Sequence, residues 1–260
     1  SARVVKPDQR VVKPGQYDTI IGMAVFSVRD VLIATHGQLR MSGPSAEFSG
    51  VSTDTRTLQP GELFVAIRGE RFDGHAFLDQ AKGRGAAGAL VQEAVAGTHR
   101  GEVRFGDWHV IEVTDTQYAL GQLAQCHRRR HRIPVIGITG SAGKTTTKEI
   151  TAAILAQGRA VLKSQGNFNN EIGLPLTLLS LHDDHRAAVL EFGMRGRGQI
   201  GYLAAIARPT VGIITNIGQT HLELLGSQLE IALAKAELSD RVLGAGPLQA
   251  VDPSKFVNEW

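Results

Sequence analysis

The sequence predicts an α/β protein in which a small N-terminal α/β domain precedes a central domain with a mostly parallel sheet. Three observations support this prediction. Short apolar, β-branched runs such as 135–139 alternate with amphipathic helical stretches, as in βαβ units. A glycine-rich segment follows that run and opens a helix, which is the arrangement of a P-loop. The 260 residues are 42% hydrophobic with 30 glycines, which suits one large or two ordinary domains.

The composition excludes several classes of protein. Cys126 is the only cysteine, so a disulfide framework and a cysteine-based zinc site are excluded, and a reducing, cytoplasmic location is expected. The sequence has no apolar run long enough to span a bilayer, and its first residues carry Lys and Arg without an apolar core. We therefore expect neither membrane insertion nor a signal peptide.

The N-terminal part of the sequence predicts a leader and a compact α/β unit. Residues 1–22 carry scattered charge, Pro and Gly without a sustained period, which predicts a disordered leader. Phe26 and the apolar residues after it predict an amphipathic helix that ends near Gly37. The domain predicted for 23–107 is expected to contain strands at 62–67 and 89–92 and a helix at 76–82.

Polar residues at strand ends and in loops of this first domain are candidate ligand contacts. They are Asp54, Arg56, Asp73 and His75, and ligand contacts concentrate in such loops. The alternative for Asp54 and Arg56 is a single surface ion pair, which would add little stability. The residues themselves leave both interpretations open.

The central domain, predicted for 108–240, is expected to start with a strand at 109–113 and an amphipathic helix at 116–130. The helical residues expected to face inward are Ala119, Leu120, Leu123, Ala124 and Cys126. A basic run, 127–132, ends this helix. It is either a set of cations favoured by the helix dipole or a nucleic-acid patch. We favour the first interpretation and expect no nucleic-acid partner, because no aromatic residues interleave the run as a single-strand binder would need.

The segment 133–150, IPVIGITGSAGKTTTKEI, predicts a nucleotide triphosphate site. Pro134 ends the preceding helix, a buried strand is expected at 135–139, and a helix is expected from Lys144. The small residues between them let the backbone turn tightly and aim N–H groups at a phosphate. Lys144 adds a mobile charge for the β and γ phosphates, and the Thr145 hydroxyl can join the coordination shell of Mg²⁺. The loop is shorter than the Walker A consensus, which places a glycine at the position of Ile138.

Polar residues also follow the later strands of the central domain. Strands are expected at 160–163, 187–190 and 211–215, with Glu191 after the second and Asn216 after the third. In an open parallel sheet ligands bind beyond the carboxyl ends of strands, so Thr145, Glu191, Asn216 and His221 are expected to converge on one edge. Glu191 suits a magnesium ligand there, the alternative being a surface glutamate that caps a strand. The expected nucleotide contacts are Thr139, Gly140, Ser141, Ala142, Gly143, Lys144, Thr145, Thr146 and Asn216.

Residues 165–175 form an Asn-rich segment that favours neither helix nor strand. Its three asparagines and two glycines supply side-chain amides for a sugar, a phosphate or metal-bound water. The sequence contains no Gly-x-Ser-x-Gly nucleophile elbow. The chemistry is therefore expected to come from ATP.

Together these motifs resemble the Mur ligase family over residues 23–238. In the first domain the resemblance rests on 52–56 with 61–69 and 73–75. In the central domain it rests on 139–149, 166–175, 191–194, and 216–227 running into 234–238. Thr-Gly-x-x-Gly-Lys-Thr is the form that the phosphate loop takes in this family, so the resemblance also explains the departure from the Walker consensus.

The resemblance implies an ATP-dependent amide ligase that uses ATP and Mg²⁺. The Asn-rich segment and the Glu191 motif favour the member that joins D-Ala-D-Ala to UDP-MurNAc-tripeptide through an acyl phosphate, in peptidoglycan precursor synthesis. The implied catalytic residues are Lys144, Lys235 and His221. The implied metal ligands are Thr145, Glu191, His221 and Lys235, the last matching a lysine that is carbamylated in the family. The implied substrate contacts are Ser52, Asp54, Arg56, Asn167 and Asn170.

The sequence departs from the family pattern in two places. The family has a third domain that contributes adenine contacts and binds D-Ala-D-Ala, whereas residues 241–260 are expected to be a tail outside the family. The central sheet is therefore expected to be incomplete, and the fragment inactive by itself and monomeric. Gln199 stands where the family usually has glutamate. The alternatives are another amide ligase of the superfamily, such as the preceding diaminoacid-adding ligase or a folylpolyglutamate synthase, or a nucleic-acid-dependent P-loop ATPase.

Overall fold

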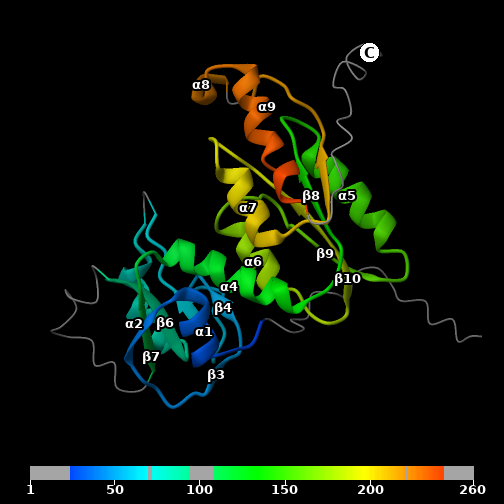
Figure 1. Ribbon diagram of the computed structural model, residues 1–260. Coiled ribbons are helices and arrows are strands. Elements are labelled where there is room, and N and C mark those ends of the chain that lie inside the picture. Colours follow the sequence, from blue (N-terminus) through cyan, green and yellow to red (C-terminus); the bar gives the residue numbers. More distant parts are fainter. Residues whose placement is uncertain (1–23, 70–71, 94–107, 221, 243–260) are drawn as a thin grey trace, which may run out of the picture.

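A computed structural model describes residues 24–69, 72–93, 108–220 and 222–242. Figure 1 shows two β-sheets with helix α4 (Thr116–Arg130) running between them. The mixed α/β architecture is the one predicted. The expected leader, 1–22, and most of the expected tail, 241–260, lie outside the described residues. Within the described ranges, no helix is both long enough and apolar enough to cross a membrane.

The first sheet has five strands in the order β2-β7-β6-β5-β4, of which only β2 runs antiparallel to its neighbour. These strands are β2 (Gln38–Met41), β4 (Val51–Ser52), β5 (Leu63–Val65), β6 (Gly88–Gln92) and β7 (His109–Val113). Its helices are α1 (Val28–Thr35), the 3₁₀ helix η1 (Gly74–Phe77) and α2 (Leu78–Gly83), and β1 (Phe26–Ser27) pairs with β3 (Glu47–Phe48). All residues of β5 and β7 are buried, as expected for parallel strands covered on both faces.

Two predictions for this region are wrong. The sequence pattern places strand 109–113 in the central domain, but β7 pairs with β6 in the first sheet. A strand buried on both faces carries no local signal that tells which sheet it joins. Phe26 is predicted to be helical but lies in β1, because Ser27 caps α1: its hydroxyl accepts a hydrogen bond from the Asp30 backbone N–H at 3.0 Å.

The second sheet is fully parallel, in the order β11-β8-β10-β9. Its strands are β8 (Val135–Thr139), β9 (Ala160–Lys163), β10 (His185–Glu191) and β11 (Val211–Ile214). Its helices are α5 (Lys144–Leu155), α6 (Gly173–Leu179), α7 (Gln199–Ala207), α8 (Leu222–Leu225) and α9 (Gln228–Ala236), followed by the 3₁₀ helix η2 (Ser239–Arg241). Because β8 lies between β10 and β11, the loop after β8 is flanked by the ends of both neighbours.

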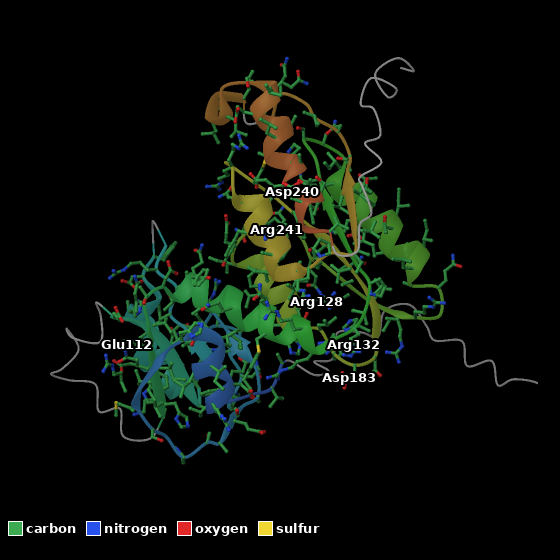
Figure 2. The ribbon with its side chains drawn as sticks, viewed as in Figure 1. Glu112, Arg128, Arg132, Asp183, Asp240 and Arg241 are labelled. Atoms are coloured by element: carbon green, nitrogen blue, oxygen red, sulfur yellow. The ribbon has the colours of Figure 1, made fainter. Side chains whose placement is uncertain are left out.

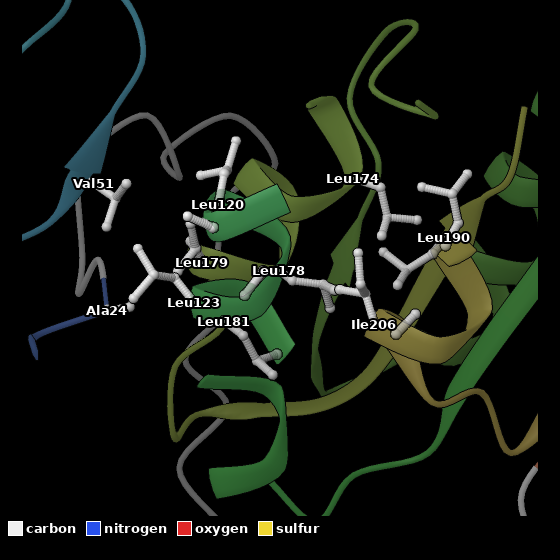
Figure 3. Close-up of a cluster of buried hydrophobic side chains, with 14 of the residues drawn as sticks. Ala24, Val51, Leu120, Leu123, Leu174, Leu178, Leu179, Leu181, Leu190 and Ile206 are labelled. Carbon is white, nitrogen blue, oxygen red and sulfur yellow. The ribbon is translucent and has the colours of Figure 1, made fainter. Parts of the chain in front are cut away.

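Helix α4 joins the two sheets through one continuous apolar core. Its side chains Leu120 and Leu123 are fully buried between residues of the first domain, such as Val51, and residues of the second, such as Leu178 (Figure 3). The predicted inward face is confirmed for the first four residues, whereas Cys126 is only half-buried. The shared core fixes the orientation of one sheet relative to the other.

The basic run at the end of α4 contributes to this packing. Arg128, labelled in Figure 2, is buried and donates to the carbonyl oxygens of Ala207 at 2.9 Å, Ile133 at 3.1 Å and His131. His127 beside it is also buried. Arg128 therefore ties the end of α4 to the end of α7 and to the start of β8, and neither residue presents its side chain to a nucleic acid.

Candidate active site

The glycine loop joins β8 to α5 with a backbone that requires glycine at two positions. Gly140 and Gly143 have φ angles of +149° and +78°, which other residues rarely adopt. A Cβ on Gly140 would lie 1.9 Å from the Thr215 hydroxyl oxygen, at the end of β11. The absence of a side chain therefore lets the loop pack directly against the neighbouring strand.

Residues that follow β11 hold this loop in shape. The Asn216 side-chain oxygen accepts the Ala142 N–H at 2.8 Å, and its carbonyl oxygen accepts the Ser141 N–H at 3.1 Å. The Ser141 hydroxyl in turn accepts the Gly218 N–H at 2.9 Å. The first N–H groups of α5 have no partner within the helix and remain available for an anion. Asn216 therefore lies against the loop, as predicted, and its hydrogen bonds fix the shape of the loop backbone.

Lys144 lies against the same loop. Its ammonium group donates to the Gly140 carbonyl oxygen at 2.7 Å, so its flexible stem folds back over the loop. A lysine held this way can turn its charge towards a phosphate by rotating about its side-chain bonds.

A buried carboxylate lies at the carboxyl end of β10. Glu191 is 3% exposed; its Oε2 accepts the Thr145 hydroxyl and its Oε1 accepts the Asn169 side-chain amide, each at 2.9 Å. Its backbone N–H donates to the Ser164 hydroxyl at 3.1 Å. No Lys, Arg or His among the described residues forms an ion pair with Glu191. A buried carboxylate without a cation is unfavourable, so this arrangement suits a bound metal ion.

Helix α9 brings an unpaired lysine to this region. Lys235 is 2% exposed, and burial, together with the nearby charge of Lys144, lowers the pKa of its amine to about 8. It has no hydrogen-bond or carboxylate partner in the described part of the chain. Glu237, just after the helix, accepts the N–H groups of Gly198 at 2.7 Å and Gly201 at 3.0 Å, which fixes α9 against α7.

These groups fit magnesium better than a transition metal. Across the described ranges, no three His, Cys, Asp or Glu side chains converge to hold an ion. One carboxylate and one hydroxyl, from Glu191 and Thr145, suit Mg²⁺ because this ion usually keeps several waters and takes phosphate oxygens as ligands. His221, the remaining expected ligand, lies outside the described residues.

The predicted substrate residues of the first domain form one turn after β4. The Ser52 hydroxyl accepts a hydrogen bond from the Asp54 N–H at 3.3 Å. Arg56 donates hydrogen bonds from Nε and Nη2 to the Asp54 carboxylate. The ion pair considered as an alternative from the sequence is therefore present. The Arg56 side chain is 83% exposed, so the pair adds little stability and leaves the guanidinium accessible to a ligand. Asp73 and His75 bond to each other at 2.5 Å elsewhere in the domain.

The asparagines of the Asn-rich segment make different contacts. Asn170 accepts the N–H groups of Ile172 and Gly173 at 3.2 and 2.8 Å, at the start of α6, so the end of this segment is helical against expectation. Asn167 is exposed. The contact with Glu191 is made by Asn169, which the sequence analysis did not select. Three asparagines in four residues gave the only signal for it, without indicating which side chain points inward.

The sequence analysis also did not identify Lys148 as a residue that supports the site. It is 1% exposed, and its ammonium group donates to the Ser164 carbonyl oxygen at 2.8 Å and pairs with Glu149 at 3.1 Å. It thereby fixes the residue whose hydroxyl holds the Glu191 backbone. In the sequence it resembles any helix lysine, so no local signal was available.

Two family models match this chain. The model described as "Mur ligase family, catalytic domain" matches residues 47–128, and the one described as "Mur ligase middle domain" matches 138–256. The chain belongs to the Mur ligase family. The second match includes the glycine loop, Glu191 and Lys235, and it extends into the segment 241–260 that we expected to lie outside the family. The first match includes β7, in agreement with its place in the first sheet.

Individual Mur ligases are similar over most of this chain. It is 46% identical over 216 residues to the UDP-N-acetylmuramoyl-tripeptide–D-alanyl-D-alanine ligase of Synechocystis sp., and 40% identical over 219 residues to that of Escherichia coli. These matches cover 83% and 84% of this chain, and 46% and 45% of the relatives. The chain thus spans about half the length of the curated relatives it matches.

Solved Mur ligases share the fold. MurF from Acinetobacter baumannii superposes with a TM-score of 0.78 at 35% identity, over 87% of this chain and 48% of that one. MurF ligase from Thermotoga maritima in complex with ADP gives a TM-score of 0.64 at 36% identity, over 72% of this chain and 42% of that one. The family resemblance deduced from the motifs is therefore confirmed.

Proposed function

We propose that this chain is part of an ATP-dependent ligase that joins D-Ala-D-Ala to UDP-MurNAc-tripeptide in peptidoglycan precursor synthesis. The observation that carries the proposal is the contact of the Thr145 hydroxyl with the buried, cation-free Glu191 at the glycine loop. This is the arrangement needed for a triphosphate with its metal. The names of the curated relatives support the identity of the two substrates.

The proposed reaction has two steps. A terminal carboxylate oxygen of the tripeptide attacks the γ-phosphorus of ATP, the bond to the bridging oxygen breaks, and ADP leaves. The neutral amine of D-Ala-D-Ala then attacks the acyl carbon, phosphate leaves with the bonding electrons, and the nitrogen loses a proton. Both steps need charge neutralisation and in-line placement more than a protein nucleophile.

The residues around the loop supply those needs. The N–H groups at the start of α5 and the ammonium of Lys144 would hold the phosphates. Thr145 and Glu191 would hold one Mg²⁺, and Glu191 with His221 a second; bound magnesium neutralises charge on the phosphate oxygens. Lys235 would serve as its carbamate, since a buried amine with a pKa of about 8 is partly neutral near pH 7 and can react with CO₂.

The first domain would bind the UDP end of the substrate through Ser52, Asp54 and Arg56. The exposed Arg56 guanidinium is suited to the diphosphate because arginine offers paired N–H donors to anionic oxygens. Asn167 and Asn170 are proposed to contact the substrate near the loop. We place the reaction in the cytoplasm, with the protein monomeric and without a nucleic-acid partner.

Binding and turnover together test the proposal. Calorimetry with UDP-MurNAc-tripeptide and with Mg·ADP should show both binding to this chain, and Lys144→Met should lose the nucleotide alone. Binding of neither ligand would refute the proposal. Residues 1–260 by themselves should turn over little or nothing, so ADP release that depends on both tripeptide and D-Ala-D-Ala would contradict the expected inactivity. In a full-length ligase, exchanging the amino-acid acceptor separates this activity from the other amide ligases of the superfamily.

A further inference from the structure

Lys148 is a buried lysine to which the proposed reaction assigns no role. Lysine is rarely buried this completely unless its charge is paired, and here the ammonium group pairs with Glu149 and donates to the Ser164 carbonyl oxygen. Burying such an ion pair costs free energy, so an apolar side chain would often serve a purely structural position as well. The hydrogen bond to Ser164 therefore points to a role beyond packing.

Lys148 and Thr145 reach from the same face of α5 to two neighbouring strand ends. Side chains three residues apart in a helix are neighbours on its surface. The Thr145 hydroxyl donates to Glu191 at 2.9 Å, and Lys148 donates to Ser164 at 2.8 Å. Glu191 ends β10, and Ser164 directly follows β9, the strand beside it. One face of the helix is thus attached to the ends of two adjacent strands.

Ser164 is bonded through all of its polar groups. This fully buried residue donates its backbone N–H to the Val189 carbonyl oxygen at 3.2 Å, and its hydroxyl accepts the Glu191 N–H at 3.1 Å. Lys148 holds the remaining group, the carbonyl oxygen. A shift of Ser164 would therefore disturb the end of β10, where the carboxylate of Glu191 is attached.

The segment that begins at Ser164 returns to the same strand end at Asn169. The Asn169 side-chain amide donates to the Glu191 carboxylate at 2.9 Å, and its carbonyl oxygen accepts the Gly193 N–H at 2.8 Å. Residues 164–169 are thus attached at both ends to the end of β10. Lys148 ties this segment to α5, the helix that carries Thr145 in its first turn.

We propose that Lys148 is a positioning residue that fixes the carboxylate of Glu191 relative to the hydroxyl of Thr145, so that the two can share one magnesium ion. The proposal rests on the proposed function, because it takes these two residues as ligands of the metal. They come from different elements, a helix and a strand. Mg²⁺ demands near-ideal octahedral geometry, so a loss of this fixed spacing weakens metal binding more than nucleotide binding.

Calorimetry of ADP binding tests the proposal. We define the metal gain as the ratio of the ADP affinity in Mg²⁺ to the ADP affinity in a chelator. Lys148→Met should lower the metal gain about tenfold, the lower end of the effect of losing a partner of a metal ligand, because Lys148 acts on Glu191 through Ser164. The affinity in the chelator should stay within about twofold, because Asn216 holds the glycine loop independently of Lys148. An equal loss of both affinities would overturn the proposal.

A second lysine in the same network provides the matched control. Lys163 also pairs with Glu149, but its side chain is 45% exposed. Lys163→Met removes the same charge and leaves the bond from Lys148 to Ser164 in place, so the metal gain should not change. Lys148→Gln, which is shorter and keeps a polar group in the buried position, is the second variant should methionine prevent folding. It should lower the metal gain in the same way, and melting temperatures show which variants are folded.

A double variant identifies the route by which Lys148 acts. Ser164→Ala removes the hydroxyl that holds the Glu191 backbone, and it should itself lower the metal gain about tenfold. If Lys148 acts through Ser164, the two substitutions together should cost much less than the product of the two single losses. A combined loss equal to that product would place the effect of Lys148 elsewhere and overturn the proposal.

Failure of this inference can be told apart from failure of the proposed function. If the unaltered chain shows a metal gain and folded Lys148 variants keep it, this inference is overturned and the proposed function remains intact. If the unaltered chain binds ADP without any metal gain, the magnesium site of the proposed function is contradicted, and this inference with it. If it binds no ADP at all, both are overturned.

Discussion

Replacing Asn169 by leucine should weaken metal binding without weakening nucleotide binding in the absence of metal. Asn169 is the permanent donor to Glu191, whereas the Thr145 hydroxyl must turn its hydrogen away when its oxygen becomes a metal ligand. The Gly193 N–H donates to the Asn169 carbonyl oxygen at 2.8 Å, and a Cβ at Gly193 would come within 2.9 Å of the Asn169 side-chain oxygen. The amide is therefore held in place before any metal arrives.

The magnitude follows from the lost hydrogen bond. A hydrogen bond to a charged group contributes about 1.5–3 kcal/mol. Because this bond also forms without metal, only the part that orients the carboxylate towards the metal enters the metal affinity, where each 1.4 kcal/mol corresponds to a tenfold change. The Glu191 backbone N–H keeps its bond to the Ser164 hydroxyl in the variant, and the carboxylate keeps its Thr145 contact in the metal-free chain, so we take the lower value. The expected result is about a tenfold rise in the dissociation constant of the metal.

Manganese provides the measurement, because its free ion gives an electron paramagnetic resonance signal that disappears on binding. Titrations with a non-hydrolysable ATP analogue should show the weaker binding for Asn169→Leu. Asn167→Leu is the matched control, since this exposed neighbour in the same segment has no contact with Glu191, and it should bind manganese as the unaltered chain does. A folded Asn169→Leu chain with manganese affinity within about twofold of the unaltered chain would refute the reasoning.

Three further predictions concern the loop, the lysine and the domain junction. Gly140→Ala should abolish detectable nucleotide binding in calorimetry, because its Cβ would collide with Thr215, while Gly158→Ala, where no atom lies within 4 Å of a Cβ, should not. Carbamate formation at Lys235, followed by ¹³C NMR with labelled bicarbonate, should increase between pH 7 and pH 9 as the amine with its pKa of about 8 loses its proton; a flat profile would contradict this. Burial lowers the pKa of His127 to about 4, so the folded state resists its protonation and stability should fall by up to about 3 kcal/mol as pH drops from 6.5 to 4. Denaturant titrations of His127→Gln should show a weaker pH dependence.

The parts of the fold that the sequence predicted are those with local causes. The strand at 135–139, the helix at 116–130 and the strand at 160–163 have the predicted bounds, because periodicity, Pro134 and the Asp115 cap act within a few residues. The sheet that β7 joins could not be predicted, because its pairing with β6 depends on contacts between distant segments. The choice of Asn169 among its neighbours depends on the side-chain direction in an irregular loop, for which no period exists.

The candidate site combines two buried ionisable groups that do not pair with each other. Glu191 lacks a cation and Lys235 lacks an anion in the described part of the chain, and each therefore destabilises the empty folded state. A metal ion compensates the first group, and conversion of the amine to an anionic carbamate would change the second from a group that repels magnesium into one that attracts it. The fold keeps both charges apart through separate anchors, Ser164 and Asn169 for Glu191, and Glu237 for the helix that carries Lys235. Ligands that supply the missing charges should therefore stabilise the folded chain in addition to taking part in the reaction.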